Sequence, residues 1–369
     1  MKKIFVWIYV LAFSLLTGAP PVDVSLVVID FKYNANDGVK VCEVQPLRIS
    51  KLSGYYHTHQ ENPDFVKDFL GDWFDSFHVP KWAEGRRLGD LQLKQIYHEK
   101  FTIISQPIIH LQVDSDVLSH KGIQPADPYD LDSYTGMMYF TSGSLRQTAG
   151  IRAQYPSIVF IDAALLPLYG DKLQTDHIFD RNNELAAYRP HWGVYEKKYD
   201  SQLASRILGE IGSDIVVIKP RHAAKGYGVI IVESSKLDST LNFILHKSDK
   251  LKNHGDPSYS YWYKESSPDF IVEEFIPSDP ILMDGKYYDP TYRCIALLSY
   301  TKKTPIIELI DGYAKLPSKA VTSSGSLNDR HKSCGTVPYY GAIREQDYSE
   351  ISDQVADCLY LLYSELMKD

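Results

Sequence analysis

The chain combines two hydrophobic periods, and each period predicts a different kind of element. Short runs of apolar and β-branched residues, bounded by turn residues, predict strands. These runs lie at 22–34, 39–44, 101–113, 157–168, 215–219, 228–233, 269–277, 293–300 and 305–313. The first two flank an Asp-Gly pair at 37–38, which predicts a hairpin.

A helical period predicts two amphipathic helices. The apolar stripe of the first consists of Leu203, Ala204, Ile207, Leu208 and Ile211, and the stripe of the second consists of Ile351, Val355, Cys358, Leu359, Leu362 and Leu366. Gly209 and Gly212 indicate where the first helix ends. Strands and helices mixed in this way predict an α/β (α+β) protein.

Composition narrows the class of protein. The chain has 369 residues, of which 44% are hydrophobic and 23% are charged, and this is typical of a globular protein with two or three subdomains. The net charge of −8 argues against a general nucleic-acid binder, which needs a basic face. Four scattered cysteines indicate neither a disulfide scaffold nor a zinc site.

The first residues are compatible with two interpretations. Two lysines precede an apolar run from Ile4 to Leu16, which is the pattern of a secretory signal, and the run is too short for a stable membrane span. The alternative is a buried first element of a cytoplasmic protein. Pro20 is a poor residue just after a cleavage site, so we expect a cytoplasmic protein, with export as the alternative.

A basic loop between two predicted strands suggests an anion site. In "VVIKPRHAAKGYGVIIVE" (216–233), the cations are Lys219, Arg221 and Lys225, and the small residues are Gly226 and Gly228. Glycines let backbone N–H groups approach phosphate oxygens closely. The alternative is an ordinary surface hairpin. The chain has no GxxxxGK[ST] motif, and no GxGxxG motif opens a helix after a strand.

A second segment could hold the rest of a nucleotide. The strand "IVEEFIP" carries Glu273 and Glu274, then Phe275 and Ile276. An adenine needs a flat apolar slot and exposed backbone groups, and a ribose needs a carboxylate for its hydroxyls. Two further cations, Arg293 and Lys319, follow on later segments.

This order of a helix, a strand ending in lysine, a glycine loop, a second strand and a glutamate-rich hinge strand resembles the ATP-grasp superfamily. The resemblance covers residues 196–320. It implies two lobes that sandwich ATP. It also implies that Lys219, Arg221, Lys225, Gly226, Gly228, Glu273, Glu274, Phe275, Ile276 and Lys319 contact the nucleotide, and that Arg293 and Lys319 take part in catalysis.

The start of the chain is similar to the circularly permuted, eukaryotic-type glutathione synthetase branch of that superfamily. "VKVCEVQPLRISKLSGYY" (39–56) would then supply the metal and substrate strands. The resemblance implies that Asp30, Glu43 and Gln45 bind Mg²⁺, and that Arg48, Ser50, Ser53 and Gly54 form the substrate loop. Three positions depart from the pattern: Gln45 replaces asparagine, Ala223 replaces a metal-binding glutamate, and Pro317 or Lys315 stands where a substrate arginine is expected.

These features divide the chain into five regions: 1–20, a signal-like or buried apolar segment; 21–56, a hairpin packing on the C-terminal lobe; 57–195, a middle region that sets substrate choice; 196–345, the nucleotide-binding lobes; and 346–369, a C-terminal helix. The leading hypothesis is a ligase that uses ATP and Mg²⁺ to join a small-molecule or peptide carboxylate to an amine through an acyl phosphate. We expect no nucleic-acid partner, and an oligomer is compatible with the sequence. The alternatives are a catalytically inactive nucleotide- or peptide-binding protein of this fold and an exported α/β binding protein of unrelated fold.

Overall fold

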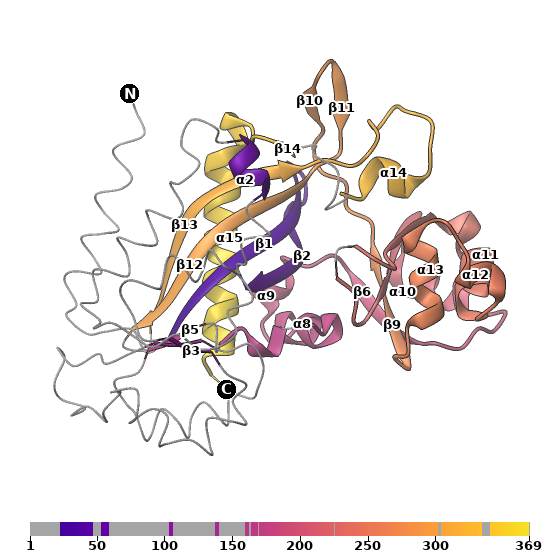
Figure 1. Ribbon diagram of the computed structural model, residues 1–369, viewed down its shortest axis with the longest axis horizontal. Coiled ribbons are helices and arrows are strands. Elements are labelled where there is room, and N and C mark those ends of the chain that lie inside the picture. Colours follow the sequence, from indigo (N-terminus) through magenta and orange to yellow (C-terminus); the bar gives the residue numbers. More distant parts are fainter. Residues whose placement is uncertain are drawn as a thin grey trace.

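The computed structural model describes residues 23–46, 53–58, 103–105, 137–139, 159–161, 164–168, 170–224, 226–301, 304–333 and 340–368. These residues form a mixed α/β structure with one large sheet, a second sheet of four strands and a two-stranded ribbon. Figure 1 shows the large sheet on one side and the four-stranded sheet on the other.

The large sheet joins the beginning of the described chain to its end. Its strand order is β14-β13-β12-β1-β5-β4-β3, and β2 also pairs with β1. The strands are β1 (Asp23–Asn34), β2 (Gly38–Pro46), β3 (Ile103–Ser105), β4 (Met137–Tyr139), β5 (Val159–Ile161), β12 (Thr291–Thr301), β13 (Thr304–Lys315) and β14 (Tyr340–Gly341). The predicted hairpin is therefore present as β1 and β2, and β1 lies antiparallel beside β12.

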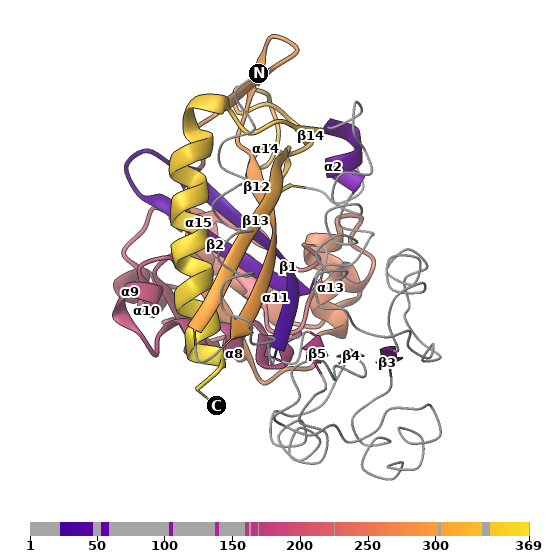
Figure 2. The same cartoon turned by 90° about the vertical axis from the view of Figure 1, so that its left-hand side faces the viewer.

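One face of the large sheet is apolar and packs on helix α15 (Glu345–Leu366). Alternate residues of β1, which point to one face of a strand, share a buried core with the stripe predicted for the last helix. This core contains Val27, Ile29, Phe31, Ile351, Val355, Cys358, Leu359, Leu362 and Leu366. Figure 2 shows α15 lying along the sheet.

The four-stranded sheet carries the glycine loop. Its order is β6-β9-β7-β8, and every neighbouring pair is antiparallel. The strands are β6 (Trp192–Glu196), β7 (Ile215–Pro220), β8 (Ile230–Glu233) and β9 (Asp269–Glu274). The boundary that we expected at residues 195 and 196 falls inside β6.

Helices pack on this sheet through a core of their own. The helices are α10 (Leu203–Ile211), α11 (Ser234–Leu245), α12 (Asp249–Lys252) and α13 (Pro257–Lys264). Leu203, Ala204, Ile207 and Ile211 of the predicted stripe are buried in that core with Val216 and Trp262. Helix α10 ends where the sequence predicts, because Gly212 takes the left-handed conformation with φ of 70°.

Short elements connect the two sheets. Helices α8 (Lys172–Phe179) and α9 (Asn183–Ala186) lie between the large sheet and β6 (Figure 1). The remaining elements are α2 (Ser53–Thr58), η2 (Leu166–Leu168), the ribbon of β10 (Ile281–Met283) and β11 (Lys286–Tyr288), and α14 (Leu327–His331). Helix α14 begins at Leu327 because Ser326 and Asp329 form a capping box.

The signal-like segment 1–20 lies outside the described residues. Within the part of the chain that the structure describes, no helix combines the length and the apolar character that a membrane span requires.

Candidate functional site

The glycine loop connects β7 to β8 and has a backbone conformation that favours glycine at two positions. Gly226 and Gly228 have φ of 70° and 73°, which is the left-handed region that other residues rarely adopt. A Cβ atom on Gly228 would lie 2.6 Å from Pro220 Cγ and 2.8 Å from Tyr261 Cδ1. Lys225, the predicted cation directly before Gly226, lies outside the described residues.

The beginning of the loop is fixed to the N-terminus of α8. Arg221 donates from Nε and Nη2 to the two carboxylate oxygens of Asp171 at 2.9 and 2.7 Å, and from Nη1 to Asp269 at 3.3 Å. The backbone N–H of Lys172 donates to the carbonyl of Arg221 at 3.2 Å. Arg221 therefore anchors the loop in this structure, and its predicted contact with the nucleotide stays a prediction.

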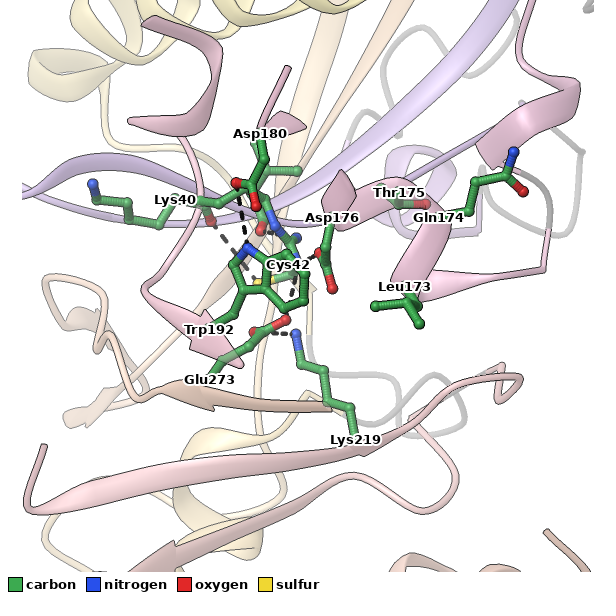
Figure 3. Close-up of polar contacts among 12 residues, drawn as sticks. Lys40, Cys42, Leu173, Gln174, Thr175, Asp176, Asp180, Trp192, Lys219 and Glu273 are labelled. Atoms are coloured by element: carbon green, nitrogen blue, oxygen red, sulfur yellow. Dashed lines mark hydrogen bonds and ion pairs between the residues drawn. The ribbon is translucent and has the colours of Figure 1, made fainter. Parts of the chain in front are cut away.

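A group of charges lies where β7, β9 and α8 meet, and we call Lys172, Asp176, Arg189, Lys219 and Glu273 the loop cluster. Lys172 is half-buried and the other four are buried. Lys219 pairs with Glu273, and Arg189 donates to Glu273 at 2.8 Å and to Asp176. Figure 3 shows the carboxylate of Glu273 facing the ammonium group of Lys219, with Asp176 approaching from α8. Arg189 also donates to the carbonyl of Val41 in β2 at 2.6 Å, so the cluster ties the two sheets together.

Burial and neighbouring charges together determine the pKa values in the loop cluster. Burial raises the pKa of Asp176 to about 6, although Arg189 opposes that rise. Burial would raise the pKa of Glu273 too, but the charges of Lys219 and Arg189 outweigh it and hold the pKa below its ordinary value. Burial also lowers the pKa of Lys172. Within the described structure, Asp176 Oδ2 and Arg189 Nε have no hydrogen-bond partner, so the cluster is incompletely satisfied.

The face of the large sheet opposite α15 buries Leu26 and Val28 at one end of β1. Its other end, which we call the polar face, carries Asp30, Arg293 and Lys315, and we call these three residues the sheet cluster. Arg293 donates from Nε and Nη2 to the two oxygens of Asp30 at 2.6 and 2.8 Å, and Lys315 Nζ donates to Asp30 Oδ2 at 2.6 Å. Burial alone would raise the pKa of Asp30. The two cations outweigh burial and hold the pKa well below its ordinary value.

Strand register brings Glu43 to the sheet cluster. Glu43, Asp30 and Arg293 are direct cross-strand neighbours on β2, β1 and β12, so their side chains share one face. Gln45 follows on the same face and donates to Glu43 at 3.4 Å. The charge of Glu43 raises the pKa of Lys315 in the sheet cluster and of Lys172 in the loop cluster, against the effect of burial. Glu43 therefore connects the two clusters electrostatically.

The predicted Mg²⁺ ligands divide into two kinds. Mg²⁺ is usually held by one or two carboxylates together with phosphate oxygens and water. The oxygens of Glu43 and Gln45, adjacent on one strand face, fit that pattern. Both oxygens of Asp30 already face cations. Among the described residues, no group of three or more His, Cys, Asp or Glu side chains could hold a metal.

The predicted hinge leaves the four-stranded sheet after Glu274, the last residue of β9. The Glu274 carboxylate accepts the N–H of His191 at 2.8 Å, and the Phe275 ring packs edge-on against His331, with ring centroids 5.0 Å apart. Phe275 and Ile276 are half-buried. Glu273, in contrast, is engaged inside the loop cluster.

The other predicted residues are more scattered. Arg48 and Ser50 lie outside the described residues, as does the side chain of Ser53 in α2. Gly54 of α2 lies directly against Tyr313 on the polar face, because a Cβ atom there would be 2.0 Å from the ring. Lys319, whose side chain is 43% exposed, pairs at 3.5 Å with Asp329 of the same segment.

Sequence reasoning did not identify three members of the loop cluster: Lys172, Asp176 and Arg189. They lie in the middle region, where the hydrophobic pattern is weak, and their partners are distant in the chain. The only available signal was local: Asp171 is a typical N-cap, and this cap fixes the start of α8, which carries Lys172 and Asp176.

A cavity of about 490 Å³ opens beside the loop cluster. Its size falls in the range of small-molecule sites. It is lined by Lys40, Asp180, Ala186, Ala187, Arg189, Pro190, His191, Trp192 and Glu274. Arg189 is the only member of the loop cluster in this lining.

No protein-family model matches the chain, and no curated protein matches it. Among solved structures, it is similar to D-alanyl-alanine synthetase A from Vibrio cholerae, with 10% identity, a TM-score of 0.30, and coverage of 62% of this chain and 59% of that chain. It is also similar to D-alanine-D-alanine ligase from Helicobacter pylori, with 16% identity, a TM-score of 0.29, and coverage of 60% and 54%. The same enzyme from Coxiella burnetii aligns at 9% identity and a TM-score of 0.26, with coverage of 71% and 81%.

The chain thus spans less than two thirds of the first two enzymes. TM-scores this low do not establish a family.

Proposed function

We propose that this protein is an ATP-dependent ligase that joins a carboxylate to an amine through an acyl phosphate. One observation carries the proposal: the sheet cluster places Arg293 and Lys315 beside Glu43, and the loop cluster places Lys172 and Lys219 at a glycine loop suited to phosphates. Phosphoryl transfer depends mainly on positioning and on stabilising charge at the phosphate oxygens. These four cations supply that charge.

The remaining parts of a nucleotide site follow from the same geometry. In the proposal, backbone N–H groups around Gly226 and Gly228 contact phosphate oxygens, and the hinge at Glu274, Phe275 and Ile276 receives the adenine. Glu43 and Gln45 would hold Mg²⁺, which neutralises charge on the phosphate oxygens. The carboxylate and amine would be small molecules or peptides bound near Arg48, Ser50, Ser53 and Gly54, with Lys319 as a further cation.

The proposed order of the chain is a permuted one. Strand β1 lies next to β12 in one sheet, so strands from the two ends of the described chain build one lobe. A circularly permuted ATP-grasp arrangement accounts for that connectivity, because it moves the metal-binding hairpin to the start of the chain.

Nucleotide binding can be tested with Lys219→Ala. ATP with Mg²⁺ should raise the melting temperature of the wild type, since a ligand present at 100 times its Kd stabilises the native state by about 2.7 kcal/mol. The variant should lose this shift yet remain folded, because Arg189 still neutralises Glu273. Lys236→Ala, which removes an exposed lysine paired with Glu233, is the matched control and should keep the shift. No shift at millimolar ATP, or a full shift in Lys219→Ala, would refute nucleotide binding at this loop.

Ligase chemistry needs a separate test. Hydroxylamine added with ATP and a mixture of carboxylates should be converted to a hydroxamate, because it captures an acyl phosphate as an amine does. ATP binding without hydroxamate or ADP, for any acceptor, would leave the alternative of a catalytically inactive nucleotide-binding protein.

A further inference from the structure

Lys315 occupies a particular place on the polar face of the large sheet. It is the last residue of β13, and its side chain is 14% exposed. Its ammonium group is 2.6 Å from Asp30 Oδ2, and the charge of Glu43 also acts on it. Asp30 and Glu43, the two carboxylates predicted to hold Mg²⁺, therefore both interact with Lys315.

Asp30 is already saturated with positive charge. Arg293 donates to both oxygens of Asp30, and Lys315 also donates to Oδ2. A divalent ion at Asp30 would have to displace a buried ammonium group, and removing one partner of a buried ion pair is strongly unfavourable. The alternative is that Asp30 holds the two cations in place.

The loop cluster also carries a lysine on which the charge of Glu43 acts. This residue is Lys172, whose Nζ donates to the carbonyl of Ala223 in the glycine loop. Lys315 and Lys172 limit the positions at which divalent ions can approach bound phosphates. Glu43 with Gln45 remains as one such position.

We propose that Lys315, positioned by Asp30, binds a nucleotide phosphate in place of a metal ion, so that this protein binds ATP with one divalent ion. The inference rests on the proposed function and deepens it. Lys315, Arg293 and Asp30 together carry a net positive charge, which attracts a phosphate oxygen. An ammonium group has three N–H donors, and Asp30 accepts one of them, so the same group can bind a phosphate oxygen while it remains anchored. Asp30 is thus a positioning residue.

The test counts ions and measures affinity. Mn²⁺ is titrated into the full chain saturated with a non-hydrolysable ATP analogue, and bound Mn²⁺ is quantified by electron paramagnetic resonance. We expect one ion per bound nucleotide in the wild type, and still one in Asp30→Asn. Lys315→Met should bind the analogue at least tenfold more weakly at every Mn²⁺ concentration, whereas Lys315→Arg, which keeps the charge, should bind within about threefold of the wild type.

Two ions in the wild type would overturn the inference, and Asp30 would be identified as a ligand if Asp30→Asn then binds one. Unchanged affinity in Lys315→Met would overturn it as well. Lys315→Met keeps the Asp30–Arg293 pair, so it tests the inference even if Asp30→Asn fails to fold. If the wild type shows no ATP-dependent thermal shift, the proposed function fails and this inference fails with it; a shift with two ions refutes this inference alone.

Discussion

The loop cluster and the sheet cluster contain the same kinds of side chain, but they differ in how completely the charged groups are paired. In the sheet cluster, one carboxylate receives two cations, and the strand register fixes all three residues on one face. In the loop cluster, two carboxylates share Arg189, and one of them, Glu273, also pairs with Lys219. These groups come from α8, β7, β9 and the segment after α9. Buried polar atoms of Asp176 and Arg189 lack partners in the described part of that cluster.

The difference separates a fixed site from an adaptable one. A fully paired carboxylate in a sheet resists rearrangement, because each contact reinforces the geometry of the others. A cluster with unsatisfied atoms and a shared carboxylate can exchange partners at lower cost. We therefore expect Lys219 to move from Glu273 to a phosphate on nucleotide binding, while Arg293 and Lys315 keep their positions. The tests below challenge this contrast.

The largest loss of stability is expected for Arg189→Met. It leaves Asp176 without its buried cation and leaves Glu273 with Lys219 alone, and breaking a buried pair costs about 3–5 kcal/mol. Urea unfolding should show this loss. Arg206→Ala is the matched control, since its pair with Asp200 is half-exposed, and it should cause no measurable change. Equal effects in the two variants would show that the loop cluster does not hold the sheets together.

A smaller effect on stability should distinguish the two clusters, because their contributions change with pH in opposite directions. The native pKa of Asp176 is raised from 3.8 to about 6 by burial, beside Arg189, Glu273 and Lys219, so native protein binds more protons than unfolded protein between these values. The stability of the wild type relative to Asp176→Asn should therefore fall by about 3 kcal/mol as pH rises through this window.

Asp30 should behave in the opposite way. Its native pKa lies below 3.8, beside Arg293 and Lys315, so its contribution is present above pH 4 and disappears as pH falls below that value. The stability of the wild type relative to Asp30→Asn should thus rise with pH. Urea unfolding of both variants at several pH values measures the two slopes. Slopes of the same sign would contradict the contrast between the clusters.

The smallest effect concerns the glycine loop next to the loop cluster. Gly212 and Gly228 have nearly equal positive φ, but a Cβ atom would collide with Pro220 and Tyr261 only at Gly228 and would meet nothing within 4 Å at Gly212. Both alanine variants should lose about 1 kcal/mol of stability through backbone strain, and Gly228→Ala should lose more because its Cβ atom also collides. Only Gly228→Ala should also weaken ATP binding, by about tenfold or 1.4 kcal/mol. Calorimetric titration of both variants distinguishes strain from displacement of the loop.

Local patterns predicted the parts of the fold that depend on local physics. The Asp37–Gly38 turn and the runs beside it predict the hairpin of β1 and β2, and the stripe from Ile351 to Leu366 predicts α15. Helices α11 and α13 were not predicted, because α11 directly follows the strand signal of β8 and the buried face of α13 contains only Ser258 and Trp262.

The site was predicted only in part, because charge partners depend on tertiary contacts. The glycine turns and the hinge after Glu274 are visible in the sequence. The partners of those charges are not: Arg189 binds Glu273 from 84 positions away, and Lys315 binds Asp30 from 285 positions away. No periodicity encodes such distances, and the individual residues resemble ordinary surface charges until the sheet brings them together.

The placement of β1 also has a consequence for how the chain folds. A completely buried strand near the start of the chain finds its neighbour β12 only after some 260 further residues, as the 263-residue separation of Asp30 and Arg293 shows. Contacts this distant in sequence form slowly. The four-stranded sheet, whose strands lie closer together in the chain, can therefore form first, while β1 remains an exposed apolar segment that a chaperone would recognise during synthesis.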